Sequence, residues 1–315
     1  MGTQDPLALA VAVVSFDTRD VLHRCLDSVV AARPAETIVV DNGSRDGSAE
    51  LVRTRFPSVR LIVNETNRGY GFAANQAVAA SSLSAVLLLN SDTILRPDAL
   101  PALGSYLARH PRAAVAGPRL ANADGSLQRS TYPFPSVADT VLGESGLHLL
   151  MRRLPWVRER FWRTWSHDAA RPVPWVLGAA LAIRRDAFQA LGGFDEQFFM
   201  YGEELDLCRR LRAAGLEVHF APVTTVTHLG GASTGQRVAA MRRQFVVSMR
   251  RYLVRHESPR STARVLGVLR ALAAARMARD ALQLRVARSA AERERLRRSL
   301  AGWKAMLAER ELWRP

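Results

Sequence analysis

Acidic and amide side chains end three successive apolar segments of this 315-residue chain. They are Asp17 after residues 7–15, Asp41 after residues 37–40, and Asn90, Ser91 and Asp92 after residues 85–89. Residues of these types often only begin turns or cap helices, but their recurrence after three segments favours a binding site. Carboxylate and amide oxygens are ligands that Mg²⁺ or Mn²⁺ takes beside diphosphate oxygens, so residues 90–92 predict a divalent-metal ligand.

A glycine turn at residues 67–75 has the features of an anion site. Gly69 precedes a predicted helix, and Asn67, Arg68 and Asn75 surround it. Backbone N–H groups in the first turn of a helix lack intrahelical partners and favour an anion, and Arg68 adds a positive charge. This segment is therefore a candidate for binding phosphate groups.

Two adjacent glutamates, Glu203 and Glu204, begin a predicted helix within an aromatic and glycine-rich segment. Neighbouring buried carboxylates raise each other's pKa, whereas the helix dipole lowers it. The alternative to a general base here is a solvated acidic first turn, but the surrounding residues favour the base. His228 follows the last predicted strand, where an imidazole could complete a metal site or contact a diphosphate, although a lone histidine is more often structural.

Strands alternate with helices through the first two-thirds of the chain. The pattern predicts strands at 7–15, 37–40, 59–63, 85–89, 113–117, 175–184 and 217–222, separated by helices at 21–30, 47–56, 72–82, 97–109, 185–191 and 203–214. This alternation is typical of an α/β fold with a mostly parallel sheet flanked by helices. Ligands bind beyond the carboxyl ends of such strands, where the three acidic segments would meet. Residues 118–174, with six prolines and four aromatics at 156–165, indicate an irregular insertion that shapes a pocket.

The net charge of +15 is concentrated after residue 240. Residues 241–315 hold 19 Lys and Arg against 6 Asp and Glu, whereas residues 1–240 hold 25 against 23. A nucleic-acid-binding domain would spread its charge over a folded basic face, so we expect the body of the chain not to bind nucleic acid. The chain is predicted to comprise an α/β domain at 1–240 and a helical basic region at 241–315.

Composition restricts the class and location of the protein. A hydrophobic share of 48% with 23% charged residues argues against a disordered or fibrous chain. The apolar runs fall short of the roughly 20 residues that span a bilayer, and no basic stretch precedes the first of them, as a secretory signal requires. Only Cys25 and Cys208 are present, so no disulfide framework is expected. These features predict a cytoplasmic protein.

Taken together, the amino-terminal segments resemble the family 2 inverting glycosyltransferases, which have the GT-A nucleotide-sugar-binding fold, and among them the bacterial rhamnosyltransferase-like members. The resemblance implies a donor site made of Ser15, Asp17, Asp41, Asn67, Arg68, Gly69, Asn75, Asn90, Ser91 and Asp92. Asn90 departs from the Asp-x-Asp motif of that family, which leaves Asp92 as the better supported metal ligand. His228 lies in a segment similar to the His-x-Gly-Gly of the family, and is implied to join Asp92 in holding Mg²⁺ or Mn²⁺.

The segment 192–210 resembles the acceptor segment of the same family, in which a Glu-Asp pair precedes a helix and the Asp is the general base. Alignment by spacing puts Glu204 in the base position, one methylene longer than usual, and Glu203 on the acceptor side. Trp175 and Gly178 begin another segment that lines the acceptor side in relatives, with a core role as the alternative for Trp175. The implied activity is transfer of a sugar, with inversion, from a dTDP- or UDP-sugar to a hydroxyl of a saccharide or polyprenyl-linked acceptor in bacterial envelope polysaccharide synthesis.

Two other function classes remain open on the sequence. Residues 69–74 fit the G-x-G-x-x-A fingerprint, with Asp92 about 20 residues on, which suggests an NAD(P)-dependent oxidoreductase with a Rossmann-like site. The oxidoreductase hypothesis leaves Asp41 and the two adjacent glutamates unexplained. The departures at Asn90 and Glu204 also permit an inactive relative that binds carbohydrate or membrane.

The basic region after residue 257 holds good helix formers and an apolar stripe at helical spacing. The stripe consists of Leu296, Leu300, Trp303 and Leu307. We expect a peripheral anchor on an anionic membrane surface, with Trp303 and Trp313 at the interface. The alternative is a set of helices packed on the catalytic domain or on a partner chain.

Overall fold

The computed structural model describes residues 5–145, 167–230 and 238–315, which divide into two compact units. Unit 1 comprises Met1–Pro133 and Ser166–Gly235, and unit 2 comprises Phe134–Trp165 and Gln236–Pro315. A helix at 137–145 thus belongs with the carboxyl-terminal helices rather than with the sheet that precedes it. The aromatic residues at 156–165, predicted to shape a pocket, lie outside the described residues.

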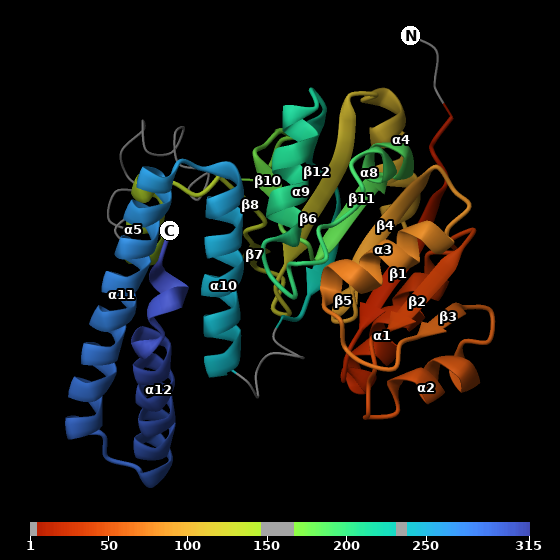
Figure 1. The fold of residues 1–315 in the computed structure, drawn as a ribbon. Coiled ribbons are helices and arrows are strands. Elements are labelled where there is room, and N and C mark those ends of the chain that lie inside the picture. The colour runs from red at the N-terminus through yellow and green to blue at the C-terminus, as the bar shows by residue number, and fades with distance from the viewer. Residues whose placement is uncertain (1–4, 146–166, 231–237) are drawn as a thin grey trace. The chain divides into compact units, whose positions relative to one another are not determined.

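Unit 1 is built on a ten-stranded sheet (Figure 1). The main path has the spatial order β3 (Arg60–Val63), β2 (Thr37–Asp41), β1 (Leu9–Ser15), β4 (Ala85–Asn90), β11 (Ala180–Arg184), β6 (Ala113–Ala121), β12 (Glu217–His228) and β5 (Thr93–Ile94). Short strands β7 (Leu127–Gln128) and β9 (Arg171–Pro172) pair with β6 and β12, while β8 (Thr131–Tyr132) and β10 (Trp175–Val176) form a separate pair. The first four strands are parallel and β12 is parallel to β6, whereas β11 runs antiparallel between β4 and β6. The predicted α/β class with a mostly parallel sheet is confirmed.

Six helices of unit 1 lie between these strands in the part of the chain that the structure describes. They are α1 (Arg19–Ala31), α2 (Ser48–Arg55), α3 (Tyr70–Ala80), α4 (Ala99–Arg109), α8 (Arg185–Ala190) and α9 (Glu203–Ala213). The chain steps outward from β1 to β2 and β3, and then returns through α3 to β4 on the other side of β1. Because parallel crossovers are right-handed, this reversal puts α3 on the opposite face from α1 and α2. The reversal also separates the loops after β1 and β4, where an open sheet binds its ligands.

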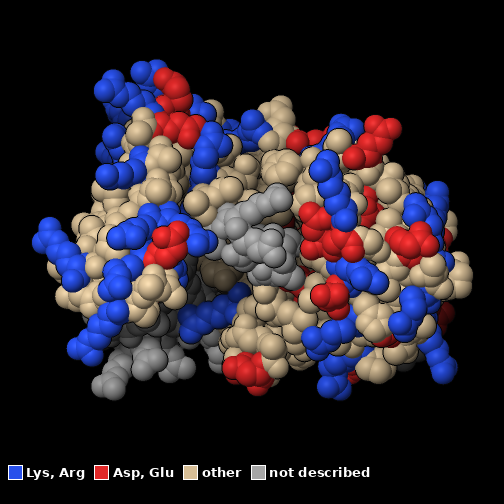
Figure 2. Space-filling model, turned by 90° about the horizontal axis from the view of Figure 1, so that it is seen from below, with Lys and Arg blue, Asp and Glu red and all other residues tan. Residues whose placement is uncertain are grey.

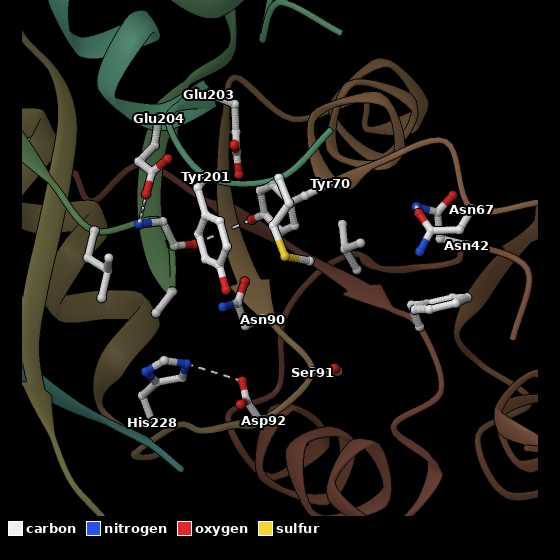
Figure 3. Close-up of a pocket in the computed structure, with 16 residues that line it drawn as sticks. Asn42, Asn67, Tyr70, Asn90, Ser91, Asp92, Tyr201, Glu203, Glu204 and His228 are labelled. Carbon is white, nitrogen blue, oxygen red and sulfur yellow. Dashed lines mark hydrogen bonds and ion pairs between the residues drawn. The ribbon is translucent and has the colours of Figure 1, made fainter. Parts of the chain in front are cut away.

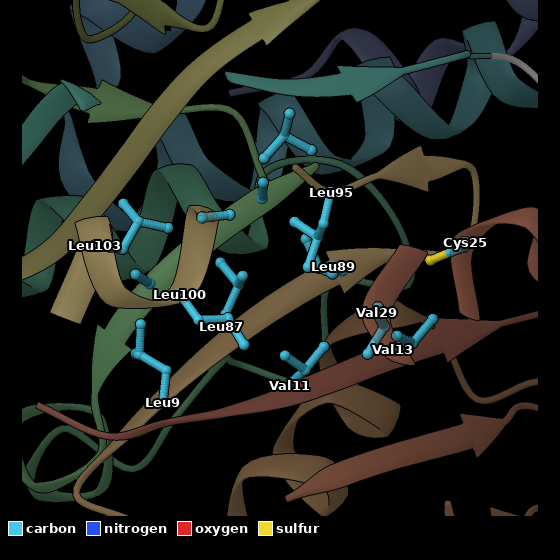
Figure 4. Close-up of a cluster of buried hydrophobic side chains, with 14 of the residues drawn as sticks. Leu9, Val11, Val13, Cys25, Val29, Leu87, Leu89, Leu95, Leu100 and Leu103 are labelled. Atoms are coloured by element: carbon cyan, nitrogen blue, oxygen red, sulfur yellow. The ribbon is translucent and has the colours of Figure 1, made fainter. Parts of the chain in front are cut away.

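The core of unit 1 lies between the sheet and the helices on one of its faces (Figure 4). Alternate residues of the two central strands point into it: Leu9, Val11 and Val13 from β1, and Leu87 and Leu89 from β4. They pack with Val29, Leu100 and Leu103 from the helices. Every residue of β1 is buried, so both of its faces are covered, and this explains its uninterrupted apolar sequence.

Two strands differ from their sequence prediction. The expected strand at 175–184 is interrupted at residues 177–179, so that β10 and β11 enter different sheets. The expected strand at 217–222 continues to His228 after a register irregularity between Phe220 and Thr225. Pro222 lies inside this irregularity, where its missing N–H costs no ladder hydrogen bond. In this continuation His228 of β12 pairs with Thr93 of β5. Strand β12 lies two strands away from β11 in the sheet.

Unit 2 is helical. It contains α5 (Val137–Ser145), α10 (Val238–His256), α11 (Pro259–Val286), α12 (Ala290–Ala308) and the 3₁₀ helix η3 (Arg310–Trp313). The hydroxyls of Ser258 and Ser289 accept backbone N–H groups at the starts of α11 and α12, which fixes the breaks between the helices. Its buried apolar side chains include Tyr252, Leu253, Val265, Leu266, Leu269, Leu296, Trp303, Met306, Leu312 and Trp313.

The two tryptophans of this unit are packed inside it. Trp303 and Trp313 are only 5% and 8% exposed, and their indole N–H groups donate to the Asp280 carboxylate and the Met306 carbonyl. The expectation that these indoles lie at a membrane interface is therefore wrong, because the apolar stripe of α12 forms the core of unit 2. No helix of the described residues is long and apolar enough to span a bilayer.

Candidate active site

A cavity of about 240 Å³ opens in unit 1 beyond the carboxyl ends of β1 and β4 (Figure 3). The predicted site residues that line it are Asn67, Asn90, Ser91, Asp92, Gly178, Glu203, Glu204 and His228. In the close-up, the two glutamates lie on one side of the cavity, and Asp92 and His228 lie on the other. Residues from five separate parts of the sequence thus face a single space.

Glu204 is held at both carboxylate oxygens by backbone N–H groups. The N–H of Gly178 donates to Oε1 at 3.4 Å, and that of Gly202 donates to Oε2 at 3.2 Å. The side chain is buried, and burial raises the pKa of Glu204 above that of an ordinary glutamate. Gly202 caps α9 with φ +91°, next to Tyr201 with φ +66°, so the chain turns sharply just before the two glutamates.

Glu203 has no such partners. Its Oε2 atom is buried without a hydrogen bond to any described residue, and the side chain is 6% exposed. Burial raises the pKa of Glu203 well above its ordinary value, and the charge of Glu204 raises it further. Burial and the two glutamates also raise the pKa values of Tyr70 and Tyr201 beside them. The pKa of Glu203 is raised more strongly than that of Glu204, so Glu204 is the carboxyl of the pair that ionises first.

Asp92 and His228 form the opposite side of the cavity, with Asp92 Oδ1 and His228 Nε2 3.2 Å apart. Gln128 orients the imidazole, because its Oε1 lies 2.7 Å from His228 Nδ1 while its Nε2 donates to Asn122 Oδ1 at 3.0 Å. The contact with Asn122 fixes the direction of the Gln128 amide, so the hydrogen of His228 belongs on Nδ1. In the neutral imidazole, the lone pair of Nε2 then faces the Asp92 carboxylate.

This donor set fits a divalent cation. Two ligand atoms bound at right angles, each about 2.1 Å from one Mg²⁺, lie about 3 Å apart, close to the separation between Asp92 and His228. No group of three or more His, Cys, Asp or Glu among the described residues could hold a metal ion. A cation here would therefore take its other ligands from diphosphate oxygens and water, as Mg²⁺ commonly does.

Three predicted donor residues lie next to the cavity but outside its lining. Asp41 is buried, with Oδ1 accepting the Ser44 N–H at 2.9 Å and Oδ2 without a partner among the described residues. Asp17, at φ +50°, donates its N–H to Ser44 Oγ and accepts the Arg45 N–H at 2.8 Å. Ser15 hydrogen-bonds Thr18 beneath this turn. The turns after β1 and β2 are thus linked through Ser44.

The glycine turn at 67–75 holds the segment before α9 in place. A Cβ atom on Gly69, whose φ is +97°, would lie 2.5 Å from the Phe199 carbonyl oxygen, so only glycine fits there. Asn75 Nδ2 donates to the Phe194 carbonyl at 3.0 Å, and its Oδ1 accepts the Phe194 N–H at 2.9 Å. The Arg68 guanidinium lies 3.5 Å over the Phe72 ring. Gly69, Asn75 and Arg68 are outside the cavity lining, and the first two position the segment that carries the glutamates.

Trp175 also lies away from the cavity. Its indole N–H donates to the Pro133 carbonyl at 2.8 Å, and its ring centroid is 5.1 Å from that of Tyr132. The Trp175 side chain therefore packs within the two-stranded sheet of β8 and β10. This agrees with the core role that was the alternative prediction for Trp175.

Four further residues of the site carry no strong sequence signal. Asn42 lines the cavity, and its Nδ2 donates to Asn67 Oδ1 and to the Gly69 carbonyl, both at 3.0 Å. Tyr70 and Tyr201 line the cavity beside the glutamates, and Gln128 lies behind His228. Asn42 could have been found from its place beside Asp41, whereas Gln128 lies 100 residues from His228 and in an irregular segment.

Comparison with known proteins gives consistent results. Residues 6–246 match the family model described as "Glycosyltransferase like family 2". The chain is 34% identical over 253 residues to the N-acetylglucosaminyl-diphospho-decaprenol L-rhamnosyltransferase of Mycobacterium tuberculosis, covering 74% of this chain and 79% of that protein. It is 24% identical to the rhamnosyltransferase WbbL of Escherichia coli, covering 78% and 92%.

Solved structures show the same fold. A mannosyltransferase from Pyrobaculum calidifontis in complex with GDP-Man and Mn²⁺ superposes with a TM-score of 0.56 at 16% identity, covering 98% of this chain and 88% of that one. GalNAc-T7 with UDP, GalNAc and Mn²⁺ gives a TM-score of 0.54 at 17% identity, covering 78% and 48%. The predicted GT-A fold is confirmed by these likenesses.

Proposed function

Because the chain belongs to glycosyltransferase family 2, we propose that the cavity transfers a sugar from a nucleoside diphosphate to an acceptor hydroxyl with inversion at the anomeric carbon. The observation that carries this proposal is the arrangement of the lining. A raised-pKa carboxylate, Glu204, faces the space from one side, and the cation-binding pair Asp92 and His228 faces it from the other.

Glu204 acts as the general base. Its carboxylate takes the proton of the acceptor hydroxyl while that oxygen bonds to the anomeric carbon, and the bond from this carbon to the diphosphate oxygen breaks. A raised pKa makes Glu204 a stronger base than an ordinary glutamate, yet one that is still ionised once the pH exceeds that pKa. The hydrogen bonds from Gly178 and Gly202 hold the carboxylate in one orientation. Glu203 contacts the acceptor beside the base.

Asp92 and His228 hold Mg²⁺ or Mn²⁺ in this proposal. When bound, the cation neutralises charge on the departing diphosphate. Gln128 keeps His228 Nε2 directed toward the shared position by accepting the hydrogen of Nδ1. The Asp17 and Asp41 turns hold the nucleoside, with the unpartnered Asp41 Oδ2 available to a nucleobase or ribose donor. Asn67, Ser91 and the amide of Asn90 line the space between nucleoside and cation.

The relatives support a donor class and an acceptor class. A dTDP- or UDP-linked L-rhamnose is the donor we propose, since two of the similar proteins are rhamnosyltransferases. The mycobacterial relative is named for a lipid-diphosphate-linked N-acetylglucosamine acceptor, so we propose a polyprenyl-diphosphate saccharide as acceptor. Such an acceptor lies at a membrane surface, where the protein would act as a peripheral enzyme.

The test is a thermal-shift panel of dTDP- and UDP-sugars, each with and without Mn²⁺. A ligand that binds only the folded state raises the melting temperature, so at least one rhamnosyl nucleotide should raise it in the presence of Mn²⁺. The Asp92→Ala variant should lose the Mn²⁺-dependent part of this shift. An equal shift in wild type and Asp92→Ala would contradict the assignment of the cation site.

A further inference from the structure

The outward face of α11 in unit 2 combines arginines with exposed apolar side chains. Residues spaced three or four apart along α11 are all exposed: Arg260, Arg264, Gly267, Ala271, Ala275, Ala278, Leu282, Arg285 and Val286. At 100° per residue these positions fall within one half of the helix surface. Alanine and glycine form the middle of this face, which we name the α11 face.

The exposed charge of this segment is entirely positive. From residue 258 to residue 291 the sequence has one acidic residue, Asp280, and it is 4% exposed. Its carboxylate accepts hydrogen bonds from Ser299 Oγ at 2.7 Å and Trp303 Nε1 at 3.0 Å inside the unit. No described acidic side chain pairs with Arg260, Arg264 or Arg285. An anionic partner is therefore the complement of this face. Figure 2 shows Lys and Arg side chains over both parts of the chain, with fewer Asp and Glu side chains among them over the helical part.

Two apolar side chains at the end of the same face favour a partner with an apolar part. Leu282 is 62% exposed and Val286 is 72% exposed, the two highest values among the large hydrophobic side chains described as exposed. They lie one helical turn apart, just before the chain turns at residues 287–289 into α12. A nucleic-acid backbone would complement the arginines but not these two side chains, whereas a lipid bilayer complements both.

We propose that the α11 face docks on an anionic membrane surface, with Leu282 and Val286 entering the headgroup boundary and the arginines on lipid phosphates. A helix of 28 residues is about 42 Å long and can lie flat on a bilayer, and the small residues in its middle allow close approach. Arginine stems add apolar contact while their guanidinium groups reach the phosphates. This rests on the proposed function, because a lipid-linked acceptor would be presented at such a surface.

The experiment is co-sedimentation of the full chain with vesicles of equal parts phosphatidylglycerol and phosphatidylcholine, and with phosphatidylcholine alone. Wild type should bind the anionic vesicles, and added salt should weaken binding. The variant Leu282→Ser with Val286→Ser should bind about tenfold or more weakly, from the loss of buried apolar surface, and Arg264→Glu with Arg285→Glu should also bind weakly. Val30→Ser, at an exposed valine of α1 in unit 1, is the matched control and should bind as wild type does.

All four proteins should melt at the same temperature, because each changed side chain is exposed. Anionic-vesicle binding by the Leu282 and Val286 variant equal to that of wild type would overturn the proposal, as would preference of the wild type for duplex DNA over the vesicles. Transfer to a short-chain, water-soluble acceptor separates the two hypotheses. Docking variants that transfer normally to this acceptor support a docking role, whereas vesicle binding without any transfer would refute the proposed activity and leave docking in place.

Discussion

Replacement of Glu204 by glutamine tests the assignment of the general base. The amide has nearly the shape of the carboxylate, so the helix start and the cavity should be kept. In the native protein, Gly178 and Gly202 each donate to one carboxylate oxygen. The amide has a single acceptor oxygen, so one of these backbone donors loses its partner, at a cost of about 1–3 kcal/mol in the free energy of unfolding.

The expected loss in catalysis is larger than this structural cost. General-base catalysis contributes roughly 10²–10⁴-fold, which at 1.36 kcal/mol per tenfold is about 2.7–5.4 kcal/mol of activation free energy. Glu204 lies across the cavity from Asp92 and His228, so the affinity for the nucleotide should change little. We therefore expect kcat to fall about a hundredfold or more while the Kd of the nucleoside diphosphate, measured by calorimetry with Mn²⁺, stays near that of wild type.

Glu204→Asp is the matched control, because it keeps an ionisable carboxyl one methylene shorter. Its rate should be reduced, since a displacement of about 1 Å can cost two orders of magnitude, but it should keep an acidic limb in its pH–rate profile that Glu204→Gln lacks. The acidic limb, in which the rate rises with pH, follows from the direction of the pKa shift of Glu204. Burial raises the pKa of Glu204, so activity should rise as the pH passes that raised pKa. A Glu204→Gln enzyme with near-normal kcat would remove Glu204 from the role.

Three further predictions concern residues around the base and the cation. In Glu203→Gln the fall of kcat/KM at high pH should disappear. Burial and Glu204 raise the pKa of Glu203, so its ionisation at high pH places a second anion beside the base. A fall of kcat/KM at high pH identical to that of wild type would argue against this role. Gln128→Leu should raise the Mn²⁺ concentration needed for half-maximal activity about 10–100-fold, the usual effect of losing a partner that orients a metal-bound histidine, and an unchanged Mn²⁺ requirement would count against His228 as a ligand. Arg210→Leu should lower the free energy of unfolding by about 3–5 kcal/mol in a denaturant titration, since it removes the ion pair with the fully buried Asp206 carboxylate and the hydrogen bonds to the Leu191 and Gly193 carbonyls, while the exposed Arg53→Leu should cost under about 1 kcal/mol.

Sequence patterns predicted the sheet well where the strands are buried on both faces. The uninterrupted apolar residues of β1 and β4 predict buried strands. The polar residues that follow each strand indicate the edge of the sheet where a ligand binds. The route of the carboxyl half was harder to predict. The break at residues 177–179 separates two apolar strands with no change in composition, and the extension of β12 to His228 depends on pairing with β5.

In the candidate site, too, residues in local sequence motifs were predicted and residues placed by long-range contacts were missed. The spacing of Asp92, Glu204 and His228 in recognisable segments allowed each to be proposed, and all three line the cavity. Gln128 and Tyr70 were missed because their positions depend on long-range contacts, between β7 and the end of β12 and between α3 and α9.

The apolar stripe of α12 was misread for a different physical reason. An amphipathic pattern identifies a face that must be buried, but it does not say whether protein or lipid buries it. In this chain the stripe packs against α10 and α11, and the most exposed large apolar side chains described are Leu282 and Val286 of α11.

The central claim is that one cavity binds a nucleotide sugar and passes its sugar to a lipid-linked saccharide. The most direct measurement is incubation of the full chain with a dTDP- or UDP-linked rhamnose, Mn²⁺ and a short-chain N-acetylglucosaminyl-diphospho-polyprenol, followed by mass spectrometry and NMR of the product. We expect an acceptor heavier by one deoxyhexose, with the anomeric configuration opposite to that of the donor, and an initial rate of its formation about a hundredfold or more lower with Glu204→Gln. A product with the donor's own configuration, or equal initial rates from wild type and Glu204→Gln, would contradict this mechanism.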